Sequence, residues 1–212
     1  MKEKTLILLA VLAIVSCRER DKTSQSGGTA TYQPDSNAVR LNNKAVDLIG
    51  QVSLYDDSLN DTLYDSALVY LNNAIEIDSL YWNAYSNKVQ VLLRLGQLEK
   101  SLEVLDALQS IKSDFAEAIM SQGFILEKMG RSESAIAKYK QALDTYEKRL
   151  KNDPGNLGVQ SDIAFLYLFL EDKNRAIDEI QNLILENPND ERLKTMGKVI
   201  KDFNREKFIA EY

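Results

Sequence analysis

A small residue recurs along the chain at nearly constant intervals, and each occurrence begins the same apolar pattern. The small residues stand 34, 34 and 41 positions apart: Ala67, Ser101, Ala135 and Ala176. Large residues follow four positions later: Leu71, Leu105, Tyr139 and Ile180. Three positions further come Ala74, Leu108, Ala142 and Leu183. Offsets of four and seven lie on one helical face, so the spacing predicts repeated amphipathic helices.

A period of 34 residues is typical of tetratricopeptide repeats. Two further positions fit: Gly96 and Gly130 precede the second and third small residues by five positions, and Gly123 supplies a small residue on a first helix. At the matching position of the fourth repeat stands Glu171, which departs from the pattern. The chain therefore resembles the tetratricopeptide family over roughly residues 38–190.

This resemblance implies an all-α fold, a right-handed α-solenoid of about four helix pairs with a C-terminal capping helix. We expect the repeats over 38–189 and the capping helix over 190–212, beginning with Asp190 as N-cap. The first helix is predicted over 38–51, followed by a longer loop over 53–61. The interval of 41 residues predicts that the second helix of the third pair is extended by about two turns.

The first sixteen residues are typical of an export signal. Lys2 and Lys4 precede an apolar run over 5–15, and Ser16 is a small residue next to Cys17. The run is too short to span a bilayer, since a spanning helix needs roughly twenty apolar residues. We predict a signal peptide over 1–16.

The end of that signal, Ile14-Val15-Ser16-Cys17, resembles the bacterial lipobox. The resemblance implies cleavage before Cys17 and acylation of that residue with diacylglyceryl and palmitate-type chains, hence a lipid-anchored envelope protein. Residues 17–37 are polar and read as a flexible tether. Because Arg18 and not Asp follows the cysteine, the resemblance favours the outer membrane, facing the periplasm or the cell surface. A free thiol behind an ordinary signal peptide is the alternative.

Composition argues against most enzyme classes. The chain has no histidine, Cys17 is its only cysteine, and it contains no glycine-rich phosphate-binding motif. We expect no metal, no cofactor and no catalytic residues; a carboxylate-based enzyme is a distant alternative. The formal net charge of −6 argues against a nucleic-acid partner.

Family resemblance places a partner-binding groove on the first helices of the pairs. The residues at the expected groove positions that we select as candidates are Gln90, Arg94, Phe124, Glu127, Phe165 and Phe169. The basic clamp that chaperone-binding members use for an acidic C-terminal peptide is replaced here by Glu117 and Ser121. We therefore expect an apolar segment as ligand, such as an amphipathic helix of an envelope protein.

An alternative stays open for the groove phenylalanines. Residues 163–170 are apolar on every side, which is typical of a helix buried on both faces. The chain itself, through its C-terminal helix or the extended helix of the third pair, could cover them. For the whole protein, the expected function is a membrane-anchored protein-interaction scaffold, and the alternative is a structural protein that self-associates.

Overall fold

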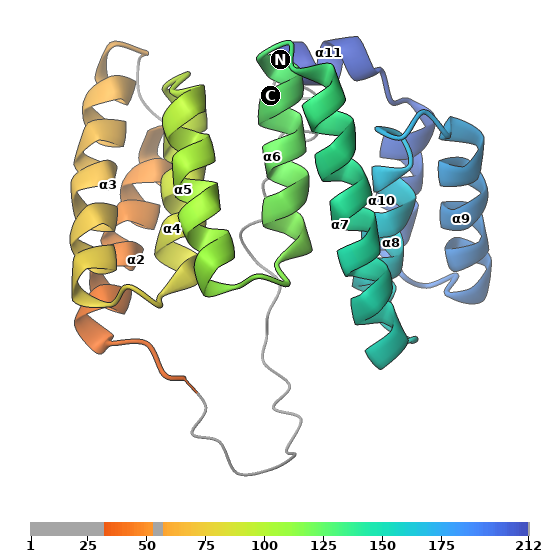
Figure 1. The fold of residues 1–212 in the computed structure, drawn as a ribbon, viewed down its shortest axis with the longest axis horizontal. Helices are drawn as coiled ribbons and strands as arrows, with labels where there is room; N and C mark the ends of the chain where they lie inside the picture. Colours follow the sequence, from red (N-terminus) through yellow and green to blue (C-terminus); the bar gives the residue numbers. More distant parts are fainter. Residues whose placement is uncertain (1–31, 53–56, 212) are drawn as a thin grey trace. The chain divides into compact units, whose positions relative to one another are not determined.

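The computed structural model describes residues 32–52 and 57–211, and these residues form helices and turns (Figure 1). They fall into two compact units, residues 32–113 and 114–211, which we describe separately. Among the described residues no helix is long and apolar enough to cross a membrane. The expected signal peptide and Cys17 lie outside the described residues.

The first unit consists of two helix pairs. Its helices are α2 (Ser36–Gln51), α3 (Asp57–Ile77), α4 (Trp82–Arg94) and α5 (Leu98–Ile111). Helix α2 packs on α3, α4 packs on α5, and α3 also contacts α4. Small residues stand where the helices meet, with Ala38, Ala45, Ala67 and Ala84 fully buried. Small side chains at such contacts let helix axes approach closely, which is the physical basis of a repeated hairpin.

The two helices of the first pair begin at other residues than expected. Helix α2 begins at Ser36, because the Asp35 carboxylate accepts hydrogen bonds from the backbone N–H groups of Asn37 and Ala38. Helix α3 begins at Asp57, inside the loop expected over 53–61. That loop prediction was too long, since the segment contains neither glycine nor proline to stop a helix.

Residues just before α2 are attached to the turn between α3 and α4. The Tyr32 hydroxyl and the Asp35 N–H donate to Oδ2 of Asp78 at 2.7 and 2.9 Å, and the Leu80 N–H donates to Oδ1 at 3.1 Å. Burial alone would raise the pKa of Asp78, but these three hydrogen bonds outweigh it and lower the pKa. The last residues of the expected tether therefore lie against this unit.

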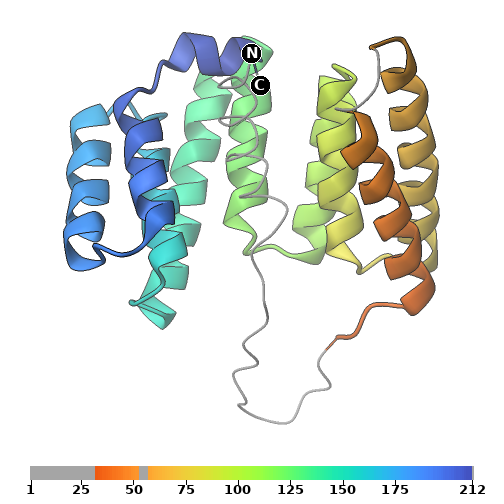
Figure 2. The same cartoon turned by 180° about the vertical axis from the view of Figure 1, so that it is seen from behind.

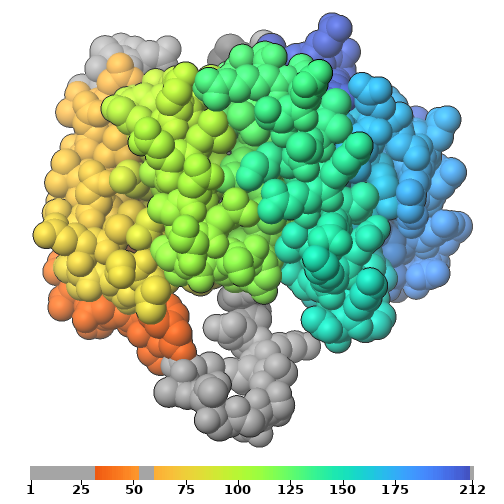
Figure 3. Space-filling model, in the orientation of Figure 1, coloured from red at the N-terminus to blue at the C-terminus, as the bar shows by residue number. Residues whose placement is uncertain are grey.

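The second unit contains two more pairs and a C-terminal extension. Its helices are α6 (Ala116–Lys128), α7 (Ser132–Asn152), α8 (Leu157–Leu166), α9 (Lys173–Glu186), α10 (Glu191–Lys201) and α11 (Arg205–Glu211). Helix α6 packs on α7, α8 on α9, and α7 also contacts α8. In the space-filling view α7 lies at the surface along its length (Figure 3). It has 21 residues where α5 has 14, which confirms the predicted extension.

The C-terminal segment is divided into two helices. Helix α10 packs against α8 and α9, whereas α11 contacts α6 and lies across one end of it (Figure 2). Asp190 caps α10, as predicted, by accepting from the N–H groups of Arg192 and Leu193. Asn204 begins the last helix, since its side chain accepts from the Lys207 N–H at 2.8 Å. We expected one continuous helix here and find two.

The predicted repeat register is confirmed. Ala135 and Ala176 are exposed by at most 1%. A Cβ built on Gly123 would overlap the Tyr139 ring, so the α6–α7 contact requires glycine. The fold is thus all-α and built from helix pairs, as the sequence predicts.

Candidate functional site

Three of the predicted groove residues meet in one aromatic cluster of the second unit. Phe124 comes from α6, Phe165 from α8 and Phe169 from the turn after α8. The ring centroid of Phe169 lies 4.6 Å from that of Phe124 and 5.5 Å from that of Phe165. All three side chains are exposed by at most 1%. The sequence prediction that these residues lie together is therefore met, but they are not open to solvent.

The C-terminal segment covers this cluster. The Phe208 ring on α11 lies 5.4 Å from Phe124 and 5.3 Å from Phe169, and the Phe203 ring lies 5.2 Å from Phe169. Edge-to-face packing of this kind stabilises a core beyond the area it buries. In this structure the chain itself covers Phe124, Phe165 and Phe169, which is the alternative that the sequence left open for them.

The backbone after α8 explains why the apolar run is buried on all sides over residues 163–169. The α-helix ends at Leu166, and the next residues make i to i+3 hydrogen bonds, from the Leu168 N–H to the Phe165 carbonyl and from the Phe169 N–H to the Leu166 carbonyl. This tighter turn advances each residue by about 120° instead of 100°. Leu168 and Phe169 thereby both point into the unit, with 5% and 0% exposure.

Charged residues form the rim of the aromatic cluster. Glu127, another predicted groove residue, accepts a hydrogen bond from the Tyr139 hydroxyl at 2.7 Å and is ion-paired with Arg205 Nε of α11 at 2.6 Å. The Lys128 ammonium group donates to the backbone carbonyls of Ile209 and Ala210 at 3.3 and 3.5 Å. Burial lowers the pKa of Lys128. Glu127 and Lys128 together hold both ends of the short helix.

A second carboxylate of this unit, that of Glu117, is held in an ion pair. Arg149 donates to both carboxylate oxygens of Glu117, at 2.7 and 3.2 Å, and to the Asp114 carbonyl at 2.8 Å. Burial would lower the pKa of Arg149, but its hydrogen bonds to Glu117 outweigh this and raise it. The position at which the family resemblance would place a basic clamp thus holds a paired glutamate.

The other two predicted residues, Gln90 and Arg94, belong to the first unit. There the first helices carry polar side chains, which we call the amide strip: Asn42, Ser86, Asn87 and Gln90. The Asn87 amide donates to Asn42 Oδ1 at 2.7 Å. Gln90 Nε2 is buried with no hydrogen-bond partner among the described residues, and Arg94 is exposed. The amide strip thus holds an unused donor, which the aromatic cluster does not.

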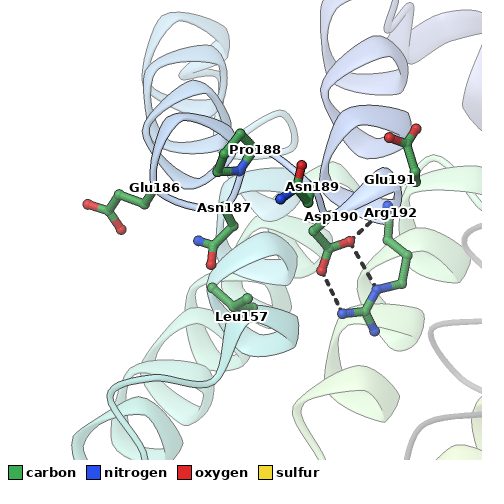
Figure 4. Close-up of a pocket in the computed structure, with 8 residues that line it drawn as sticks. All are labelled: Leu157, Glu186, Asn187, Pro188, Asn189, Asp190, Glu191 and Arg192. Atoms are coloured by element: carbon green, nitrogen blue, oxygen red, sulfur yellow. Dashed lines mark hydrogen bonds and ion pairs between the residues drawn. The ribbon is translucent and has the colours of Figure 1, made fainter.

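A hollow lies beside the turn between α9 and α10 (Figure 4). It measures about 590 Å³ and is lined by Leu157 and residues 186–192. The Asp190 carboxylate there accepts hydrogen bonds from the Arg192 side chain at 2.7 Å and from the first N–H groups of α10, and these bonds lower its pKa. The Asp190 carboxylate of this hollow is therefore used within the fold. The described residues contain no group of Cys, Asp and Glu side chains arranged to hold a metal ion.

Comparisons with known proteins point to the same repeat. Residues 126–197 match the sequence model of the tetratricopeptide repeat. The Hsp70-Hsp90 organising protein of Plasmodium falciparum is 31% identical over 101 residues, which cover 48% of this chain and 37% of that protein. The chain thus spans well under half of this relative's length.

Solved structures with a similar arrangement include the first repeat domain of Spaghetti (RPAP3) bound to an HSP90 peptide. It is 16% identical, with a TM-score of 0.44, covering 66% of this chain and 99% of that chain. The MamA RS-1 ArsTM double mutant is 18% identical, with a TM-score of 0.46, covering 84% and 92%. A tetratricopeptide repeat protein from Parabacteroides merdae is 16% identical, with a TM-score of 0.37, covering 79% and 74%.

Sequence reasoning missed the role of Arg205 and Phe208. Both lie in a segment expected to continue a single capping helix, so neither was assigned to the groove. A signal was present: Asn204 is a good N-cap, and Arg205 and Phe208 are spaced for one helical face. Reading that N-cap as a new helix would have separated the last helix from α10.

Proposed function

We propose that the protein is a membrane-anchored scaffold that binds other proteins in the bacterial cell envelope. The observation that carries this proposal is the tetratricopeptide match over 126–197, on helices packed in the pairs that such repeats form. Proteins of this design present side chains from consecutive hairpins to a partner. The name of the Plasmodium relative, an organising protein, is consistent with a binding role.

A binding role fits the composition better than catalysis does. The chain lacks histidine, its one cysteine is the expected lipid attachment site, and Glu117 and Glu127 are engaged in ion pairs. A carboxylate held in an ion pair is not available as the free acid or base that general acid–base catalysis uses. We propose no cofactor and no metal.

The ligand class differs from that of the chaperone-binding relatives. An acidic C-terminal peptide needs unpaired basic side chains in the groove, whereas this chain places Glu117, bound by Arg149, at that position. We therefore propose apolar or basic segments of envelope proteins as partners.

The anchor is proposed at Cys17, on the resemblance of residues 14–17 to a lipobox. Each buried methylene contributes about 0.8 kcal/mol, so two or three acyl chains on one residue hold a protein firmly. A polar tether of roughly fifteen residues, up to Tyr32, gives a root-mean-square reach of roughly 20 Å. The repeats would then stand just off the membrane, and we propose the outer membrane.

The experiment is affinity purification of the tagged full-length protein from cell membranes, beside Cys17→Ser. Mass spectrometry should find an acylated Cys17 as the first residue, and Cys17→Ser should leave the membrane fraction. Specific envelope proteins should copurify with the wild type. Recovery of the wild type alone, as an oligomer by light scattering, would replace this proposal with the self-associating structural protein.

A further inference from the structure

Helix α11 is held to the second unit by the contacts a bound ligand would make. It has only seven residues, and isolated helices shorter than about twelve residues are marginal in water. Its order therefore depends on the surface it covers. Residues 202–204 separate it from α10, so it is connected to the rest of the unit by a short non-helical link.

The apolar part of this contact is one anchor in one pocket. Phe208 is 5% exposed, and its ring lies within 6.2 Å, centroid to centroid, of four other phenylalanine rings. A single aromatic side chain packed among other apolar side chains is the usual pattern of an interface anchor. The next residue of α11, Ile209, is only half-buried.

The polar contacts bring groups of opposite charge or partial charge together at both ends of α11. Arg205 pairs with Glu127 at 2.6 Å and approaches Glu171 at 3.6 Å, and its guanidinium carbon lies 5.9 Å from the Phe169 ring centre. At the other end Lys128 donates to two of the last carbonyls of α11, which no helix can satisfy internally. The surface thus selects a helix with a cation near its start, an aromatic residue one turn later, and its carbonyl end at Lys128.

Glu171 supports this interpretation independently. Its φ is +64°, in the left-handed region where the two earlier hairpin turns use Gly96 and Gly130. A residue with a Cβ is strained in that conformation. Strained residues of this kind tend to persist at binding sites. Here the strained turn supplies a carboxylate toward Arg205 that glycine cannot.

We propose that the surface formed by α6 and the turn after α8 is a binding groove for a short amphipathic helix with arginine three residues before phenylalanine. Helix α11 occupies this groove as an internal ligand, and a partner helix of the same chemistry displaces it. The inference rests on the proposed function, because it names the partner class of that same binding protein.

The test uses the full-length protein and a fluorescein-labelled peptide of residues 202–211 as the displacing helix. In the wild type the tethered α11 competes at an effective concentration in the millimolar range. Phe208→Ala removes the internal anchor, so the peptide should bind this variant at least tenfold more tightly than the wild type. Glu127→Gln in the same background should weaken peptide binding at least fivefold. A peptide carrying Phe208→Ala should not bind.

No binding to a folded Phe208→Ala variant, or equal binding after Glu127→Gln, overturns the proposal. Dimerisation of the wild type through exchanged α11 helices overturns it in favour of a second copy as partner. If the variant fails to fold, amide hydrogen exchange on the wild type tests the proposal instead. The backbone amides of α11 should exchange at least a hundredfold faster than those of α6 and α8. Equal protection of the three helices would refute displacement. Envelope proteins that still copurify would show that only this groove, and not the binding function, is wrong.

Discussion

The two units use the same hairpin contacts but line their first helices with different chemistry. In residues 32–113, α4 carries the polar side chains Ser86, Asn87 and Gln90, whereas in residues 114–211 the corresponding helices carry Phe124 and Phe165. The polar lining is covered within its own unit, since Ser86 is 2% exposed and Gln90 Nε2 is buried without a hydrogen-bond partner among the described residues. The aromatic lining is covered by the C-terminal segment, through Phe203 and Phe208. The small residues fix the hairpins in both units, whereas the expected groove positions of the first helices carry different side chains in each unit.

The prediction with the largest expected effect compares a substitution in the aromatic lining with one in the polar lining. Phe169→Ser removes a fully buried ring and places a hydroxyl in its pocket, so it should lower the free energy of unfolding by about 3–5 kcal/mol. Gln90→Ala removes a buried amide that lacks a hydrogen-bond partner among the described residues, so it should change stability by less than about 1 kcal/mol. Urea denaturation of both variants measures the difference. Equal midpoints would show that the aromatic lining is not core.

The helix pairs were predictable because their cause is local. Ala135, Tyr139 and Ala142 are buried as their spacing requires, since the period of an α-helix fixes which side chains share a face. The cover of the groove was not predictable in the same way. It depends on whether α11 separates from α10 at Asn204 and on where Phe208 then packs, which is a contact between segments about 80 residues apart.

A second prediction tests the hairpin contact that both units share. Ala135 is 1% exposed on α7, so Ala135→Leu should overpack the α6–α7 contact and cost about 1–3 kcal/mol. Lys138→Ala, three residues further along the same helix and partly exposed, should stay within about 0.5 kcal/mol. Thermal unfolding of the two variants gives the comparison, and similar melting temperatures would contradict the register.

A third prediction concerns the first unit alone. Asp78→Asn should lower stability by at most about 1 kcal/mol at pH 7, because the carboxylate that accepts from Tyr32, Asp35 and Leu80 is accessible to solvent. The pKa of Asp78 is lowered by these bonds, so their contribution is present above the ordinary value of about 4 and is lost as the pH falls through the lower folded-state value. The stability difference between wild type and variant, followed from pH 7 to pH 2, should therefore shrink below pH 4. A difference that grows on acidification would contradict the assignment.

For the candidate groove residues, too, the sequence predicted local neighbours but not contacts with distant segments. The sequence correctly grouped Phe124, Phe165 and Phe169, because positions along repeated helices determine their neighbours. It could not decide between solvent, a partner and the chain itself as their cover. Hydrophobicity requires that such rings be covered but does not specify by what.

The smallest expected effect compares equivalent turns of the two units. Gly96 in the first unit and Glu171 in the second both have positive φ, at 68° and 64°. Glu171→Gly should relieve the strain of a left-handed residue, partly offset by the greater freedom of glycine in the unfolded chain, for a net gain of about 0.5 kcal/mol. The lost approach to Arg205 costs little for global stability, since Glu171 is largely exposed. Gly96→Ala should lose about 1 kcal/mol, because alanine must then adopt the conformation that glycine tolerates. Opposite signs for these two variants in urea denaturation would show that Glu171 stands in its turn at a cost to stability, which is the pattern expected of a residue retained for what it binds.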